Sequence, residues 1–591
     1  MNHLARNLSL LPEETARRIK GATLPVELSV APAKSGAPVP RLGDTPLHSA
    51  YHPEREGERF GADVAPGSTA VVFGFGFGYH LETLARRDDV DLTVIEPDDG
   101  LLKAALTERD LTDILPRIRI VTPEAFAAEA EGRSYAAAVW LDHPPTAARR
   151  PQRRTPLYEP FAARRFAAGF RPKVMVVGPI YGGTVPTAAS TARAFTRLGC
   201  DVRFVDHTER QTEYFGVDRA IKDAVNARTV KNSYLEYLGQ RLAATVLDYA
   251  PDLIVALAQA PIPETALRQL RQYGAPLLFW FVENHRTIGY WPQLAPLYDY
   301  FFCLQKGELL DRLADAGAPY AGWLPQAADD EVCVPQTLSD ADRRTYGAPV
   351  SFFGAGYPNR RRFFAEMLDL PGLALFGSEW DLSSPLGQLV KNGNRRMAPE
   401  EYVKIFAASA INLNLHSSLT ATGIDPMADF VNPRTFEIPA AGGFELVDMR
   451  DDLGAMFDIG RELAVFTDID DLREKIAHYL AHPEQRAAIA AAGRERVVFE
   501  HTVVHRAAKM LLVVAERDGD RMIENRRRRA GINDVDRLIA ETTDPALKAF
   551  LTPMAGSGKL SLSKAMERIA EGDGPLTRPE QVFVMMNEML S

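Results

Sequence analysis

One acidic residue and a pair of glycines stand close together in the stretch Asn432-Pro433-Arg434-Thr435-Phe436-Glu437-Ile438-Pro439-Ala440-Ala441-Gly442-Gly443. The pattern predicts a short apolar helix carrying Glu437, a tight turn at the glycines and a buried strand over 444–447. A carboxylate on such a helix can accept two charge-assisted hydrogen bonds from the cis-diol of a nucleotide ribose. Small residues such as Gly442 and Gly443 let a backbone approach a ligand closely. The stretch therefore predicts a nucleotide site, provided that the surrounding chain builds a suitable fold.

Short apolar runs alternate with helical patterns on both sides of this stretch. Such alternation over two successive segments predicts two α/β units, each a doubly wound parallel sheet. Ligands of these sheets bind at the carboxyl ends of the strands. We place the two units at 173–325 and 346–515, with strands predicted at 173–177, 201–205, 253–256, 277–282, 300–304, 350–353, 373–376, 410–416, 444–447 and 463–466.

A further α/β unit is predicted at 1–150. An apolar strand leads into Gly74-x-Gly76-x-Gly78 and a helical pattern, and the next strand ends at Glu96. The glycines permit a tight turn, and the acid stands where Rossmann-type units hold a ribose diol. The pattern resembles S-adenosylmethionine-dependent methyltransferases. It also resembles the Rossmann-like core of the Maf flagellin glycosyltransferases, in which a glycine-rich turn leads into Tyr-His-Leu. A methyl-donor ligand at Gly74, Gly76, Gly78 and Glu96 is one expectation, and a retained fold with altered chemistry is the other.

Composition limits the class of protein. The 591 residues carry a formal net charge of −10, and the pI is near 5.8, which argues against nucleic acid as the main partner. Three widely spaced cysteines match no metal-ligand spacing and are typical of a reducing compartment. No apolar run reaches the roughly 20 residues that a membrane helix needs, and the N-terminal segment lacks a signal-peptide pattern. We therefore expect a cytoplasmic protein without a transmembrane segment.

Two segments carry little pattern. Residues 151–172 are basic and proline-containing, and they predict a linker with a helix between the first two units. Residues 516–591 contain short, charged helical patterns, and they predict a small helical tail to which we assign no chemistry.

Four motifs in order resemble one known family. Phe353-Gly354 is followed by Tyr357-Pro358-Asn359-Arg360, and then come 411–416, the stretch 432–443 and the tail 500–506. Over about 173–512 the chain resembles the CgeB-like (spore-maturation-protein-like) glycosyltransferases, which are related to glycosyl transferases group one. The resemblance implies the GT-B architecture, in which two Rossmann-like domains face a cleft. It also implies a nucleotide-diphospho-sugar donor, a UDP- or GDP-sugar, in the second of these domains and the acceptor in the first.

The resemblance also implies which residues hold the donor. Relatives carry two glutamates eight positions apart; Glu437 aligns with the second and Asp429 stands at the first, whereas Glu445 lies inside the following strand. GT-B enzymes neutralise the leaving diphosphate with basic side chains and helix N-termini. We expect Asp429 near the donor sugar or the phosphates, and donor contacts from Gly354, Arg360, Arg361, His416, Arg434, Glu437, Gly442 and Gly443.

Acceptor activation is expected from the unit at 173–325. Gly182 and Gly183 follow a strand, and their backbone amides can approach the donor phosphates or the acceptor. His207, Glu283 and His285 also follow strands and are the candidates to polarise an acceptor hydroxyl. No clear D-x-D metal motif stands in a loop after a strand, so we expect transfer without a metal ion.

These expectations converge on a glycosyltransferase of the metal-independent hexosyltransferase type. Its acceptor would be a protein, such as flagellin or another surface protein, or a glycan. Two alternatives stay open: methyltransferase activity of the N-terminal unit, and a non-catalytic sugar- or protein-binding module that keeps the folds. Binding of S-adenosylmethionine without binding of a nucleotide sugar would favour the methyltransferase.

Overall fold

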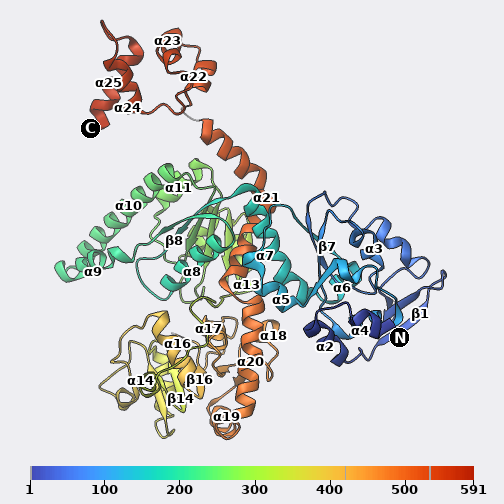
Figure 1. Ribbon diagram of the computed structural model, residues 1–591. Helices are drawn as coiled ribbons and strands as arrows, with labels where there is room; N and C mark the ends of the chain where they lie inside the picture. The colour runs from blue at the N-terminus through green and yellow to red at the C-terminus, as the bar shows by residue number, and fades with distance from the viewer. Residues whose placement is uncertain (1–2, 419–420, 532–533, 591) are drawn as a thin grey trace.

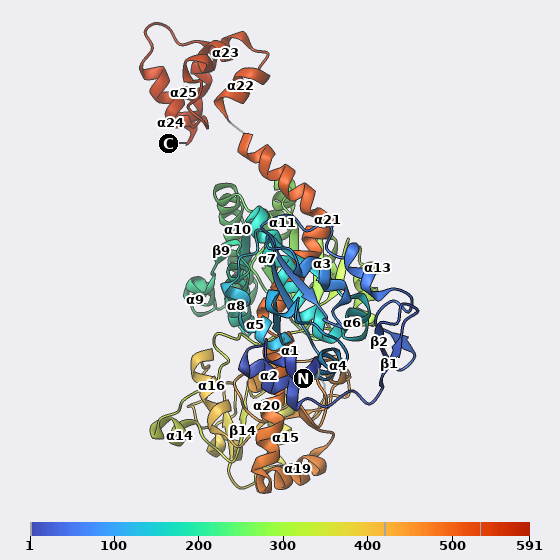
Figure 2. The same ribbon diagram turned by 45° about the vertical axis from the view of Figure 1, so that its right-hand side comes forward.

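The computed structural model describes residues 3–418, 421–531 and 534–590. It consists of three α/β units and a small helical end (Figure 1, Figure 2). Each unit has its own parallel sheet, because short apolar strands alternate with helices that cover the faces of the sheet.

The first unit is built on a four-stranded parallel sheet of order β6-β5-β4-β7. An antiparallel three-stranded sheet, β1-β2-β3, precedes it. The strands are β1 (Leu28–Pro32), β2 (Pro38–Leu42), β3 (Thr45–Pro46), β4 (Thr69–Phe73), β5 (Asp91–Ile95), β6 (Ile118–Val121) and β7 (Ala138–Asp142). The helices are α1 (His3–Leu8), α2 (Glu13–Gly21), α3 (Glu82–Ala85), α4 (Asp99–Glu108), α5 (Pro123–Ala128) and α6 (Pro144–Arg149).

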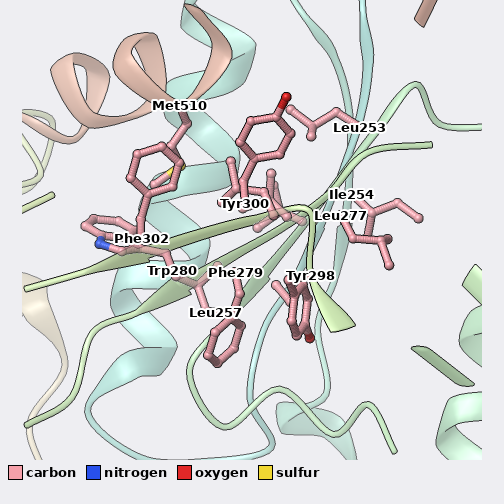
Figure 3. Close-up of a cluster of buried hydrophobic side chains, with 14 of the residues drawn as sticks. Leu253, Ile254, Leu257, Leu277, Phe279, Trp280, Tyr298, Tyr300, Phe302 and Met510 are labelled. Carbon is pink, nitrogen blue, oxygen red and sulfur yellow. The ribbon is translucent and has the colours of Figure 1, made fainter. Parts of the chain in front are cut away.

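The second unit has a six-stranded parallel sheet of order β13-β12-β11-β10-β8-β9. Its strands are β8 (Lys173–Val177), β9 (Asp201–Val205), β10 (Leu253–Leu257), β11 (Leu277–Phe281), β12 (Tyr300–Cys303) and β13 (Ala321–Trp323). Its helices are α8 (Thr184–Arg197), α9 (Gln211–Ala220), α10 (Ala224–Tyr249), α11 (Glu264–Tyr273), α12 (Trp291–Leu294) and α13 (Glu308–Asp315). Figure 3 shows the core, in which large side chains of β11 and β12 such as Trp280 and Phe302 pack around Met510 of a distant helix.

The third unit has a five-stranded parallel sheet of order β15-β14-β16-β17-β18. Its strands are β14 (Val350–Phe353), β15 (Leu373–Phe376), β16 (Ile411–Asn414), β17 (Glu445–Asp448) and β18 (Ala464–Phe466). Its helices are α14 (Asp340–Tyr346), α15 (Pro358–Ala365), α16 (Pro399–Ala408), α17 (Arg434–Ala440), α18 (Leu453–Met456), α19 (Ile469–Ala481) and α20 (Pro483–Glu500). The second and third units are the two doubly wound halves of a GT-B architecture, so the predicted fold class is confirmed.

Two long helices join the units. α7 (Pro151–Phe170) occupies the segment expected as a linker with a helix, and it is packed on both sides: Phe161 lies in the core of the first unit and Ala167 in that of the second. α21 (Val503–Gly531) leads back from the third unit to the second and inserts Leu511 into the core there. The boundary expected at 515/516 therefore falls inside one continuous helix.

The chain ends in four short helices beyond α21: α22 (Val535–Glu541), α23 (Pro545–Leu551), α24 (Leu562–Ala570) and α25 (Arg578–Leu590). They form a lobe at the far end of α21 (Figure 1) with a small core of their own around Phe550 and Leu551. Across the described part of the chain, no helix is both long and apolar enough to pass through a membrane.

Candidate active site

The carboxyl edges of the second and third sheets meet through polar contacts. Arg286 follows β11, and its guanidinium donates to Asp429 Oδ1 at 2.6 Å. Gln305 follows β12 and donates to the same oxygen at 3.0 Å. Lys306 forms an ion pair with Asp452 at 3.1 Å. These contacts bring together the strand ends at which doubly wound folds hold ligands.

Glu437 lies on α17 at this edge of the third sheet. Its Oε1 accepts a hydrogen bond from the Tyr402 hydroxyl at 3.0 Å, and its Oε2 accepts one from Arg434 at 2.9 Å. The Arg434 guanidinium lies over the rings of Phe353 and Tyr402. Each carboxylate oxygen keeps a second lone pair, so Glu437 can still accept hydrogen bonds from a ligand. The carboxylate is thus held in one orientation by its neighbours.

Asp429 lies in the loop that connects β16 to α17. Burial alone would raise the pKa of its carboxyl, but hydrogen bonds from Arg286 and Gln305 outweigh burial and hold the pKa below its usual range. Asp429 is therefore ionised and turned toward the second unit. Gln305 also accepts from the His285 ring at 2.9 Å, so it bridges two of the residues predicted to be catalytic.

The guanidinium of Arg360 donates hydrogen bonds to backbone carbonyls of the protein. Its side chain is buried, and it donates from Nε and Nη2 to the carbonyl of Leu415, at 3.0 and 2.8 Å, and from Nη1 to that of Ala355 at 3.0 Å. Burial lowers the pKa of Arg360 to about 9, and the charge of Arg434 adds to the effect. These donors hold the ends of β14 and β16 together, so the phosphate contact expected from Arg360 would require it to leave its carbonyl partners. The next residue, Arg361, is only half-buried.

His416, from which a donor contact was expected, is also buried. Its Nδ1 donates to Asp448 at 2.7 Å, and its Nε2 accepts the backbone N–H of Asn432 at 2.9 Å. Asp448 in turn pairs with the buried Arg450, which donates to the carbonyl of Asp425 at 3.1 Å. Since both ring nitrogens are engaged, His416 fastens the loop before α17 to the sheet.

Gly442 and Gly443 lie at the opposite edge of the sheet from Glu437. Gly442 has a φ of +79° and ends α17, donating to Pro439 O at 2.8 Å. A Cβ on Gly443 would lie 2.9 Å from Phe406 O, so this glycine permits close packing against α16. Both residues precede β17, at its amino end, whereas ligands of such sheets bind at the carboxyl ends of the strands. Gly354 follows β14 and does lie at the carboxyl edge.

Glu283 is held in place by hydrogen bonds from two other side chains of the second unit. Its Oε1 accepts from Gln259 Nε2 at 2.9 Å and from the Thr184 hydroxyl at 3.2 Å. Burial raises the pKa of Glu283, which favours its use as a base near neutral pH. Gln259 is held at a left-handed φ of +64°, and its N–H donates to the Tyr290 hydroxyl at 2.9 Å. The ends of β8, β10 and β11 thus converge on one carboxylate.

The other predicted residues of this unit lie at the carboxyl ends of the same sheet. Gly182, with φ +110°, lies beside Gln259, where a Cβ would contact the side-chain oxygen. Gly183 directly precedes α8 and faces open space. His207 is buried, its Nδ1 donating to Gly178 O at 3.1 Å, and burial lowers its pKa. His285 has a buried Nε2 without a hydrogen-bond partner.

The glycine loop of the first unit is filled by the chain itself. Glu96 is buried and accepts the backbone N–H groups of Phe75 at 2.7 Å and Asp98 at 2.8 Å, and burial raises its pKa to about 8. A Cβ on Gly74 would lie 2.6 Å from Thr146, and one on Gly76 would lie 2.5 Å from His48. Gly78 is packed in the same way against Phe75. The Rossmann-like sheet is retained, and the chain's own side chains pack against the glycine loop at which a methyl donor was expected.

Two family models and one curated relative match parts of the chain. Residues 338–512 match the family described as glycosyl transferase-like, and residues 50–121 match the glycosyltransferase Maf N-terminal domain. The spore protein CgeB of Bacillus subtilis (strain 168) is 24% identical over 272 residues, which cover 44% of this chain and 82% of CgeB. This part of the chain is therefore similar to CgeB.

Solved structures resemble the chain more distantly. The sucrose-phosphate synthase of Thermosynechococcus elongatus is 13% identical, with a TM-score of 0.42 over 59% of this chain and 100% of the synthase. HepE of Anabaena, solved with UDP-glucose, is 13% identical, with a TM-score of 0.40 over 58% of this chain and 99% of HepE. The predicted resemblance to CgeB-like glycosyltransferases is confirmed by the CgeB relative and the glycosyl transferase-like match, and the resemblance to the Maf N-terminal region by its family match.

Sequence reasoning missed three residues of the candidate site. Gln259 and Gln305 each come two residues after the end of a buried strand, which is a signal that could have singled them out. Tyr402 lies in the middle of α16, and nothing in the sequence distinguishes it from a core aromatic residue. All three are found only through their contacts with Glu283, Asp429 and Glu437.

Proposed function

We propose that the chain transfers a sugar from a nucleotide-diphospho-sugar, a UDP- or GDP-sugar, to a protein or glycan acceptor without a metal ion. The third unit would hold the donor and the second unit the acceptor. A cytoplasmic location belongs to the same proposal, because all three cysteines are free and buried. The observation that carries the proposal is Glu437, oriented by Tyr402 and Arg434 at the carboxyl edge of a sheet within the glycosyl transferase-like segment.

On the donor side, the ribose diol would donate its two hydroxyls to Glu437. Arg434 and Arg361 would lie near the diphosphate, where their charges stabilise the leaving group as the sugar–phosphate bond breaks. Arg360 acts indirectly, because it holds the two strand ends that support Arg434 and the glycine turn. Asp429 orients the two units through Arg286 and Gln305.

On the acceptor side, the oxygen of the acceptor hydroxyl would form a bond to the anomeric carbon of the sugar. The bond from that carbon to the phosphate oxygen breaks, and the nucleoside diphosphate leaves with the electron pair. Glu283 would take the hydroxyl proton, since its Oε1 is held by Gln259 and Thr184 and, among the residues that the structure describes, no hydrogen bond engages its Oε2. His285 and His207 lie within the same group of strand ends.

The test is a panel of UDP- and GDP-sugars measured by calorimetry and by hydrolysis of the donor. Glu437→Gln should weaken donor binding by about 10- to 100-fold, since the charge-assisted hydrogen bonds to the diol are lost. Glu474→Gln, on the exposed face of α19, is the matched control and should bind as the wild type does. Equal donor binding by Glu437→Gln and the wild type would refute the assignment of the ribose site.

A further inference from the structure

Three histidines from separate segments meet in the first unit. His48 lies between β3 and β4, His80 follows the glycine loop, and His143 follows β7. All three are at most 5% exposed, and one ring nitrogen of each lies within 4.8 Å of a ring nitrogen of the other two. Within residues 3–418, 421–531 and 534–590, no other group of three histidine, cysteine or carboxylate side chains comes together in this way.

The hydrogen bonds show which ring nitrogen carries the proton, because carbonyl and carboxylate oxygens only accept. Each ring donates one N–H outward: His48 Nδ1 to Glu56 at 2.7 Å, His80 Nε2 to Gly74 O at 3.1 Å and His143 Nε2 to Leu47 O at 2.9 Å. The lone pairs therefore lie on His48 Nε2, His80 Nδ1 and His143 Nδ1. Burial of all three rings favours their neutral form.

Each of the three rings has the kind of outer hydrogen-bond partner that metal-binding histidines use. Such histidines give their other N–H to a carboxylate or a backbone carbonyl, which orients the ring and raises its basicity. The ring centroids are 4.4, 4.8 and 5.6 Å apart. An ion about 2.1 Å from each nitrogen in tetrahedral geometry would separate the centroids by about 5 Å.

The lone pairs differ in what they contact. His80 Nδ1 is buried and, within the described part of the chain, has no hydrogen-bond partner. Leaving a buried polar atom without a partner costs about 1–3 kcal/mol. His48 Nε2 accepts the N–H of Phe77 at 2.8 Å, and His143 Nδ1 accepts the Thr146 hydroxyl at 2.8 Å. The ring planes are inclined by only 12–29°, so coordination requires the rings to turn and these two neutral donors to be released.

We propose that His48, His80 and His143 bind one divalent transition-metal ion of the zinc class. Neutral imidazoles suit zinc, copper, nickel and iron, and the set contains no thiolate that would select a softer ion. The ion would join the segment before β4, the glycine loop and the turn after β7. It would stabilise the first unit and takes no part in sugar transfer, which is proposed for the other two units.

The test uses the full chain, stripped with a chelator and dialysed against Zn²⁺. Metal content by inductively coupled plasma mass spectrometry should give one zinc per chain, and zinc should raise the unfolding temperature. His80→Phe and His143→Phe, which keep an aromatic ring in place, should each lose the stoichiometric zinc. His52→Ala is the matched control, because His52 is exposed on the same segment, and it should retain the ion.

If a phenylalanine variant folds poorly, two further measurements still test whether the three histidines bind a metal ion. Glu56→Gln should weaken zinc binding by about 10- to 100-fold without abolishing it, since the carboxylate supports His48 from behind. Co²⁺ bound in place of Zn²⁺ should give the visible absorption of a four-coordinate site with three nitrogen ligands and one water. Absence of stoichiometric zinc in the wild type, or zinc retained by both phenylalanine variants, would overturn the proposal.

Discussion

Arg360 and Arg361 are adjacent in sequence and have opposite environments. Arg360→Met leaves the buried carbonyls of Leu415 and Ala355 without donors, at about 1–3 kcal/mol each, and should lower the unfolding temperature clearly. Arg361→Met, at a half-buried position, should change stability by about 0.5 kcal/mol or less and should raise the KM for the donor. Thermal unfolding and donor titration of both variants measure the two effects separately.

The reversed pattern would contradict this division of roles. If Arg360→Met unfolded at the wild-type temperature and lost donor binding, then Arg360 would be the phosphate ligand that the sequence motif suggested. The guanidinium would in that case exchange carbonyl partners for phosphate when the donor binds.

Glu445 gives the protein a pH dependence. Burial raises its pKa to about 8, against about 4.3 in an unfolded chain. Between these values the folded chain keeps a proton that the unfolded chain has lost, so the free energy of unfolding should fall as the pH rises from about 4.3 to about 8. Glu445→Gln keeps the neutral form, and its unfolding temperature should fall less steeply over this range.

Glu96 also contributes to the pH dependence of the unfolding temperature. Its pKa is also raised to about 8, so it contributes a similar slope to both proteins, and the difference between them isolates Glu445. Parallel pH profiles for the wild type and Glu445→Gln would show that Glu445 is ionised in the folded chain.

At the scale of single elements, the positions of the strands could be predicted closely from the sequence. The roles of the residues that flank the strands could be predicted less well. The apolar run 444–447 corresponds to β17 (Glu445–Asp448), and Glu437 lies on the predicted helix, now α17. Yet the same helix places Glu437 and the glycines at opposite edges of the sheet. Motif reading treats a continuous stretch as one site, whereas a helix of seven residues spans about 10 Å.

Gly442→Ala tests what the glycine at the end of α17 does. An L-residue in a left-handed conformation costs about 1–2 kcal/mol, and Gly442 has a φ of +79°. The variant should therefore unfold at a lower temperature while its affinity for the nucleotide sugar stays at the wild-type value. A lowered affinity at unchanged stability would return Gly442 to the donor site.

At the scale of the whole molecule, sequence patterns predicted the number and the order of the α/β units. They did not predict how helices α7 and α21 join these units. α7 and α21 run side by side, with Lys509 of α21 paired to Glu159 of α7 at 2.9 Å. A buried Asp252 after α10 receives Arg526 and Arg529 from α21 as well. Such long-range pairs leave no local pattern, because each partner alone looks like an ordinary surface charge.

The contact between Arg286 and Asp429 makes the relative placement of the second and third units testable. Both side chains are about one-quarter exposed, so the pair should contribute about 1 kcal/mol or less. Arg286→Asp or Asp429→Arg places like charges face to face, and each should increase the radius of gyration in small-angle X-ray scattering. The double exchange, Arg286→Asp with Asp429→Arg, restores opposite charges and should recover the wild-type value. Because Gln305 would lose its acceptor in the exchanged pair, recovery of donor affinity should be only partial. Wild-type scattering from both single variants would mean that the helices α7 and α21, and not this pair, hold the two sheets in register.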